Sequence, residues 1–487
     1  MNPSTVLIII IGYFALLLSI SYVTSRNATN LTFFLGNRQS PWYIVAFGMI
    51  SATLSGVTFI SVPGYVMNSQ FSYMQIVLGY LLGYFVIANI LMPMYYRLNL
   101  TSIYTYLEKR FGKSSYKAGA SFFMLSRTIG AAFRLFIIAN VLQITLFNQW
   151  NIPFEATVVI TILLIWLYTF KGGIRTIIWT DSLQTLFMLT AVGITVYMIT
   201  QELDMSFSGM VNSVADSNHS KIFFLENWNG EYHFIKQFLS GAFIAIVMTG
   251  LDQDMMQKNL SCRNIKEAKK NMYWFSVALI PVNLMFMSLG ALLIIYAKRE
   301  GIPLPEQSDD LFPIIATQGY LTPAVGIFFL IGIVAAAYSS ADSALTALTT
   351  SFTVDILNTK GMEEKPLKRL RKKVHVGMSV LLVIIILIFN AVNDEAVISA
   401  LFTVAGYTYG PLLGMYTFGL FTRYQVRDKW VPFVAVLSPI LCGVLSYYSE
   451  TLFNGYQFGF EILIVNGFFT LVGLFLLSKR QNKEIDV

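Results

Sequence analysis

Cysteine, histidine and charge are all scarce in this chain of 487 residues. It has two cysteines and three histidines, and only 12% of its residues are charged. Cys262 lies in a basic loop and Cys442 in an apolar run, so the two would lie at different depths and no disulfide framework is expected. The histidines, His219, His233 and His375, fall in predicted loops or at their edges, which argues against a buried histidine metal site or proton relay.

Hydrophobic residues, in contrast, make up 55% of the chain. A chain with that composition is neither a soluble globule nor a disordered tail, so we expect an all-α polytopic membrane protein embedded in the lipid bilayer. The net charge of +7 does not indicate nucleic acid, because the basic residues are placed so as to orient a membrane protein.

Hydropathy predicts about thirteen transmembrane helices in a single transporter domain over 1–487. The predicted spans are 4–24, 43–66, 74–96, 119–146, 154–170, 176–200, 237–257, 271–296, 322–354, 374–392, 396–421, 430–448 and 459–478. The first span has no basic residue before it and no cleavage site after it, so it is expected to be retained.

The distribution of basic residues predicts the orientation. Seven alternate loops contain 27 of the 33 lysines and arginines, and the opposite loops contain four. We therefore expect the N-terminus outside and the C-terminus in the cytoplasm.

The ninth predicted span contains a stripe of small and hydroxyl residues with an aspartate at its margin. At helical spacing the stripe is formed by Ala336, Ser339, Ser340, Ser343, Thr346 and Thr350, with Asp342 beside it. Such a stripe can be a close helix–helix seam. An ionisable group at membrane depth, however, normally marks an ion or substrate path, and hard oxygen ligands suit Na⁺ or a proton.

Two other spans are interrupted at mid-length. The second carries four hydroxyls and a glycine between residues 51 and 58, and the seventh carries Met248-Thr249-Gly250. Unwinding there would free backbone carbonyls that a bound cation can satisfy, which is typical of transporters built from inverted repeats. The alternative is an intact helix whose serines and threonines bond back to their own carbonyls.

Asp181, Arg127 and Arg134 are further charged residues within predicted spans. Asp181 needs a partner unless it lies close enough to the cytoplasmic interface to cap a helix. Arg127 and Arg134 are seven residues apart on one helical face, and each could bind an anion or pair with a buried carboxylate. Asp252, Asp254 and Lys258 are expected near a solvated helix end.

Several blocks resemble the sodium/solute symporter family, which includes the sodium–glucose, proline, iodide and monocarboxylate transporters. They are residues 336–343, residues 172–181, residues 100–111 and residues 410–414. Within that family the pattern is most similar to the bacterial sodium/sialic-acid symporters. The resemblance implies a five-plus-five inverted-repeat core with two broken helices. The first repeat would cover 43–200 and the second 237–421, with an extra span at 4–24 and two C-terminal spans within 430–478.

The same resemblance implies site residues. A sodium site shared by the family would use backbone carbonyls or hydroxyls of Ser51, Leu54, Ala336, Ser339 and Ser340. A second cation site would use Asp181, Ser339, Asp342 and Ser343, although Asp342 stands where these relatives have serine. Substrate would contact Thr53, Ser55, Thr58, Gln75, Arg127 and Arg134.

Two of these assignments are displaced from the relatives' positions. The relatives' carboxylate-binding arginine aligns with Gly130, one turn from both arginines here, and their glutamine aligns with Val77, close to Gln75. From residues and resemblance together we expect no enzyme. We expect a Na⁺-coupled symporter of the bacterial inner membrane that imports a small organic solute. The first candidate for this solute is an acidic sugar such as sialic acid or another carboxylate. A neutral-sugar or amino-acid symporter and a solute-sensing receptor are the alternatives, and no oligomer is required.

Overall fold

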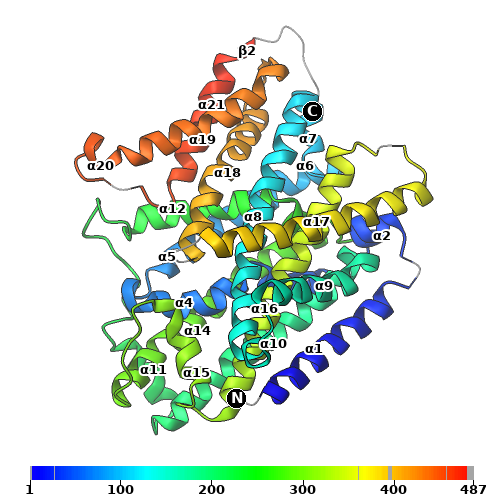
Figure 1. Ribbon diagram of the computed structural model, residues 1–487. Helices are drawn as coiled ribbons and strands as arrows, with labels where there is room; N and C mark the ends of the chain where they lie inside the picture. The colour runs from blue at the N-terminus through cyan, green and yellow to red at the C-terminus, as the bar shows by residue number, and fades with distance from the viewer. Residues whose placement is uncertain (1–2, 27, 360, 393–396, 457, 480–487) are drawn as a thin grey trace.

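The computed structural model describes residues 3–26, 28–359, 361–392, 397–456 and 458–479, and the described chain is almost entirely helical (Figure 1). The long helices of the N-terminal half are α1 (Pro3–Thr24), α3 (Trp42–Thr53), α4 (Gly56–Ser69), α5 (Tyr73–Val86), α8 (Lys113–Thr145), α9 (Phe154–Gly172) and α10 (Ile174–Glu202). Short helices between them are α2 (Asn30–Leu35), α6 (Met92–Arg97), α7 (Thr105–Arg110) and α11 (Phe207–Ala215).

The C-terminal half continues the same pattern. Its helices are α12 (Phe234–Ala245), α13 (Gln253–Leu260), α14 (Ile265–Arg299), α15 (Leu311–Thr317), α16 (Pro323–Ser351), α17 (Glu364–Val392), α18 (Val397–Phe421), α19 (Val431–Tyr447), α20 (Ser449–Leu452) and α21 (Ile462–Leu476). Three π-helical turns, η2 (Ile87–Leu91), η4 (Ile246–Gly250) and η6 (Phe352–Ile356), extend α5, α12 and α16. Two two-residue strands, β1 (Gln425–Val426) and β2 (Ser478–Lys479), pair antiparallel.

The expected number of spans is not confirmed. Among the described residues, eight helices are long and apolar enough to cross a membrane, or ten if each of two bent pairs counts as one span. The predicted spans 154–170 and 459–478 correspond to shorter apolar helices, Phe154–Phe170 and Ile462–Leu476. The span predicted at 396–421 corresponds to α18, and its first residue lies outside the described residues.

Both predicted helix interruptions are confirmed. The axes of α3 and α4 differ by 55°, and the helix through Gly250 bends by 66° to α13. Leu54 ends α3 with φ −85° and ψ 82°, which is outside the helical region and stops the hydrogen-bond ladder. The hydroxyls near this position therefore do not maintain an intact helix by bonding back to their own carbonyls.

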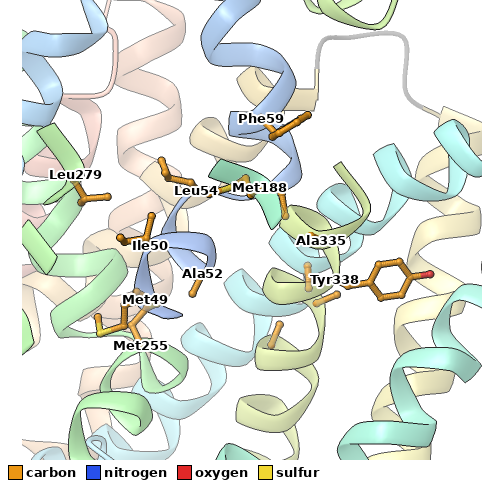
Figure 2. Close-up of a cluster of buried hydrophobic side chains, with 14 of the residues drawn as sticks. Met49, Ile50, Ala52, Leu54, Phe59, Met188, Met255, Leu279, Ala335 and Tyr338 are labelled. Carbon is orange, nitrogen blue, oxygen red and sulfur yellow. The ribbon is translucent and has the colours of Figure 1, made fainter. Parts of the chain in front are cut away.

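The buried core surrounds these two breaks. Helix α16 packs against α10, and α12 packs against α5, while α1 lies at the edge beside α9 (Figure 1). Figure 2 shows the apolar packing around the first break, with Leu54 at the link between α3 and α4 and with Phe59 on α4. The same view places Tyr338 of α16 with its ring pointing away from the broken helix. Apolar side chains thus hold the break in place and leave its polar groups for other partners.

Candidate functional site

A central pocket lies between the two breaks. Residues of the first break, of α5, of α8 and of the second broken helix line it. The lining comprises Ala52, Thr53, Leu54, Ser55, Thr58, Val62, Tyr73, Tyr80, Tyr84, Arg127, Arg134, Ile244, Ala245, Met248, Thr249, Met255 and Asn283. Five of the six residues expected to contact substrate are therefore brought together.

Gln75 is the exception. Its Nε2 donates to the Tyr232 carbonyl at 2.9 Å, and its Oε1 accepts from the Phe224 amide at 3.2 Å. The side chain therefore holds the segment between α11 and α12 and does not line the central pocket. The structure places Gln75 away from the other candidates because its amide is already satisfied by backbone groups.

The two arginines on α8 have different surroundings. Arg127 forms ion pairs with Asp252, at 3.9 Å, and with Asp254 at the start of α13. Arg134 is 7% exposed, forms no ion pair within the described residues, and its Nε is a buried donor without a partner there. The sequence left two roles open for each arginine, binding an anion or pairing with a buried carboxylate. Arg127 has carboxylate partners, whereas Arg134 lines the central pocket and has no such partner among the described residues.

The acidic turn at Asp252 is buried, contrary to the expectation of a solvated helix end. Asp252, Asp254 and Lys258 are each at most 1% exposed. The break at Gly250 places this turn inside the protein, where Tyr409 donates its hydroxyl to Asp252 and Arg127 supplies the compensating charge. Sequence spacing did not reveal the burial of this turn. The residues after Gly250 would lie at the end of a straight helix, whereas the break places them inside the protein.

The candidate cation residues of α10 and α16 lie next to one another. Ser339 donates its hydroxyl to Asp181 Oδ1 at 2.7 Å, and its Oγ lies 2.9 Å from Ser51 Oγ. Ser51 also donates to the backbone carbonyl of Asp181 at 3.0 Å. The serine of the first break, the serine of the α16 stripe and the aspartate of α10 therefore form one hydrogen-bonded cluster, in which Asp181 is buried.

Asp181 has a partner that the sequence did not indicate. Lys258 Nζ lies 2.7 Å from Asp181 Oδ2, and both side chains are 1% exposed. Asp342 in turn accepts a hydrogen bond from Tyr168 on α9 at 2.8 Å, so it pairs with neither arginine. A lysine at an expected helix end and a tyrosine in an apolar span carry no signal that would have identified them.

Several polar atoms around this cluster have no partner among the described residues. They are Asp342 Oδ1, Ser340 Oγ, Ser343 Oγ and Thr346 Oγ1 on α16, and Thr53 Oγ1 on α3. Leaving buried polar groups unpaired costs free energy, so the presence of four of them close together on α16 is typical of a ligand site rather than a simple helix seam.

Histidine gives one further correction. His375 is buried within α17, with Nε2 3.1 Å from Thr169 Oγ1 and Nδ1 2.8 Å from Thr349 Oγ1. It was expected at a loop edge because the basic run before it resembles a cytoplasmic loop, whereas α17 begins at Glu364 and includes that run. Its two threonine neighbours join α9, α16 and α17, which makes the ring a structural contact.

Other pocket residues escaped the sequence analysis. Tyr73, Tyr80 and Tyr84 line the pocket, but in an apolar span such aromatic residues are typical of the buried core. Asn283 in the middle of α14 did carry a signal, because an amide in a long apolar run must find a partner. Its Nδ2 donates to the Leu279 carbonyl at 2.7 Å, and its Oδ1 has no partner among the described residues.

Broken helices around a central pocket, with buried oxygen atoms beside it, are typical of a secondary membrane transporter. Comparison with known proteins agrees. The sequence profile of the sodium:solute symporter family matches residues 33–425. The sodium/sialic acid symporter SiaT of Proteus mirabilis is 28% identical over 472 residues, 91% of this chain and 90% of that protein. The sodium/sialic acid symporter NanT of Aliivibrio fischeri is 27% identical over 418 residues, 82% of this chain and 80% of that protein.

A solved structure has the same fold. A substrate-bound, outward-open Na⁺-coupled sialic acid symporter superposes with a TM-score of 0.81 at 20% identity, covering 98% of this chain and 99% of that one. The chain belongs to the sodium:solute symporter family. It is a multi-pass membrane protein and a sodium-coupled transporter of a small solute, and it is not an enzyme.

Proposed function

We propose that this symporter imports a small acidic organic solute together with Na⁺, with an acidic sugar such as sialic acid or another carboxylate as the first candidate. Arg134 is the observation that carries this proposal: a buried guanidinium faces the central pocket and has no carboxylate partner within the described residues. An anionic solute would supply the bidentate acceptor that a guanidinium fits best. Two of the relatives are named as sialic acid symporters, which supports an acidic substrate.

Hydroxyls of the first break would orient the solute. Thr53, Ser55 and Thr58 line the same pocket, and the Thr53 hydroxyl has no partner among the described residues. Asn283 Oδ1 is a further acceptor for a solute hydroxyl or amide. A hydroxylated acid can therefore satisfy the arginine at one end and the short polar side chains at the other.

Two cation sites are proposed beside this pocket. The first would use Ser51, Leu54, Ala336, Ser339 and Ser340, and the second Asp181, Ser339, Asp342 and Ser343. Ser340 Oγ has no partner among the described residues, which supports the first site, and Ser343 Oγ and Asp342 Oδ1 likewise have none, which supports the second. Each Na⁺ entering contributes about 2.3 kcal/mol per 100 mV and about 1.4 kcal/mol per tenfold gradient. The entry of a monovalent anion is opposed by the membrane potential. At about 100 mV and a tenfold Na⁺ gradient, one Na⁺ would therefore support about tenfold accumulation of the anion, and two Na⁺ several thousandfold.

The role of Arg134 in solute binding is tested by measuring uptake into proteoliposomes under an inward Na⁺ gradient. The substrates are sialic acid, monocarboxylates, neutral sugars and amino acids. Arg134→Lys should lose most solute affinity, because a point charge cannot replace the planar fork. Na⁺-dependent thermal stabilisation of the same variant should persist, which shows that it folds. Unchanged affinity in folded Arg134→Ala would favour a neutral sugar or amino acid. Binding without accumulation would favour a solute-sensing receptor.

The orientation and the two repeats, 43–200 and 237–421, are part of the proposal, as is location in a bacterial inner membrane. The loop asymmetry supports the orientation. Both native cysteines are buried, so introduced cysteines can be read without removing them. Ser220→Cys should react with impermeant reagent added outside intact cells and Gly361→Cys should not. The reverse labelling would overturn the orientation.

A further inference from the structure

The ammonium of Lys258 lies within the proposed second cation site. It approaches Asp181 Oδ2 to 2.7 Å, while the other oxygen of the same carboxylate accepts from Ser339. The side chain reaches Asp181 from α13, which follows the second helix break. The ammonium therefore contacts a carboxylate that the second Na⁺ would use as a ligand.

Lys258 is held by few contacts. An ammonium has three N–H donors, and the ion pair with Asp181 is its only polar contact within the described residues. Structural lysines at buried sites normally use their remaining donors, because each unpaired donor costs free energy. A buried lysine with one contact on a flexible four-carbon stem can be exchanged for another cation.

The local charge balance leaves room for one more cation. Asp181 and Asp342 are both fully buried, and Lys258 is their one cationic neighbour at ion-pair distance among the described residues. Arg127 pairs with Asp252 and Asp254, and Arg134 forms no ion pair with the carboxylates that the structure describes. If both carboxylates are ionised, the cluster is one positive charge short. Asp342 Oδ1 and Ser343 Oγ are oxygens of this cluster that have no partner in the described part of the chain.

We propose that Lys258 is a tethered cation that occupies Asp181 when the second site has no Na⁺, and that Na⁺ binding displaces its ammonium. This inference rests on the proposed second cation site. Its consequence is that Asp181 has a positive charge beside it with or without Na⁺, so the return of the empty transporter does not leave the Asp181 carboxylate uncompensated. The same competition weakens Na⁺ binding at the second site and favours its release.

The test is the thermal stability of the purified full-length protein as a function of Na⁺ concentration, with choline keeping ionic strength constant. Lys258→Met keeps the length of the side chain and removes the competitor. We expect the variant to be less stable than wild type without Na⁺ and to gain more from Na⁺. Its half-saturating Na⁺ concentration should fall at least about tenfold. The double variant Lys258→Met/Asp181→Asn should lose that gain, because the Asp181 carboxylate for which the ammonium and Na⁺ compete is absent.

Lys258→Arg covers the case in which Lys258→Met does not fold. A guanidinium keeps the charge and grips the carboxylate with two hydrogen bonds, so the half-saturating Na⁺ concentration should rise several-fold. An unchanged value in either folded variant would overturn the inference and make Lys258 a structural counter-ion. Absence of any Na⁺ stabilisation or Na⁺-driven uptake in wild type would instead overturn the proposed function itself. Wild-type Na⁺ binding combined with unchanged variants overturns the inference alone.

Discussion

The two broken helices differ in how the polar groups freed at each break are satisfied. Both α3–α4 and α12–α13 interrupt a membrane helix and bend it, by 55° and 66°. At the second break the protein satisfies the freed groups itself. Tyr95 donates to the Gly250 carbonyl at 2.8 Å, Tyr104 donates to the Leu251 carbonyl at 2.9 Å, and Asp252 caps α13 by accepting from the Asp254 amide at 2.9 Å.

At the first break the corresponding groups have fewer partners. Ser55 begins α4 without a side-chain cap, and the Thr53 hydroxyl has no partner within the described residues. Ser340 on the facing helix is in the same situation. Backbone polar groups at membrane depth must be satisfied by protein, water or ligand. The first break is thus suited to ligands, while the second is a fixed structural bend, and the following predictions test that contrast.

The largest effect is expected at the second break. Asp252→Ala removes the cap of α13, the acceptor of Tyr409 and a partner of Arg127. Breaking a buried pair on one side typically costs about 3–5 kcal/mol, so a large fall in Tm is expected. Added Na⁺ or solute should not restore it. If Na⁺ or solute restored the Tm of this variant, the turn would belong to the ligand-binding groups, and the proposed difference between the two breaks would be wrong.

Removing Ser340 should affect ion binding and leave folding intact. Because the Ser340 hydroxyl contacts no protein partner among the described residues, Ser340→Ala should change the Tm without Na⁺ little, whereas half-saturating Na⁺ should rise about tenfold. The measurement is Na⁺-dependent thermal stabilisation. Thr195→Val is the matched control, since that hydroxyl bonds to the Ala191 carbonyl of its own helix. Equal shifts in the two variants would count against a cation at Ser340.

Thr53→Val tests the solute side of the first break. The substitution keeps the side-chain shape and deletes a buried hydroxyl without a partner, so stability should be unchanged or slightly higher. Uptake should show a KM raised about fivefold to tenfold, which corresponds to a hydrogen bond of about 1 kcal/mol. A clear loss of stability with normal uptake would mean that the hydroxyl supports the bend itself.

The smallest effect is expected for Tyr95→Phe. The change removes one hydrogen bond to the Gly250 carbonyl and should lower the free energy of unfolding by about 1 kcal/mol. Half-saturating Na⁺ and solute KM should stay at wild-type values. An altered Na⁺ response would show that the second break also takes part in ion binding.

Both breaks could be predicted from the sequence because each has a local cause. Four hydroxyls and a glycine interrupt the second predicted span, and Thr249-Gly250 the seventh. The cluster of Ser51, Asp181 and Ser339 was also within reach, through the resemblance to the symporter family and the helical stripe on α16. In an apolar span such residues are costly, so their presence alone signals a site.

Pairing between distant segments was not predictable. Arg127 and Arg134 lie on one face of α8, and nothing local distinguishes them. The turn after Gly250 nevertheless places carboxylates at ion-pair distance from Arg127, whereas Arg134 has no ion pair in the described part of the chain. Gln75 likewise turns to the backbone of another segment.

A helical membrane transporter with broken helices could be predicted from the sequence alone, because hydropathy, basic loops and polar residues in apolar spans are local properties. Which buried charge pairs with which depends on the tertiary structure. Lys258 reaches Asp181 because the 66° bend turns α13 back toward α10, and Tyr168 reaches Asp342 because α9 packs against α16. In a low-dielectric interior the partner of a charge determines what it can do, and that partner is chosen by packing between segments far apart in the chain.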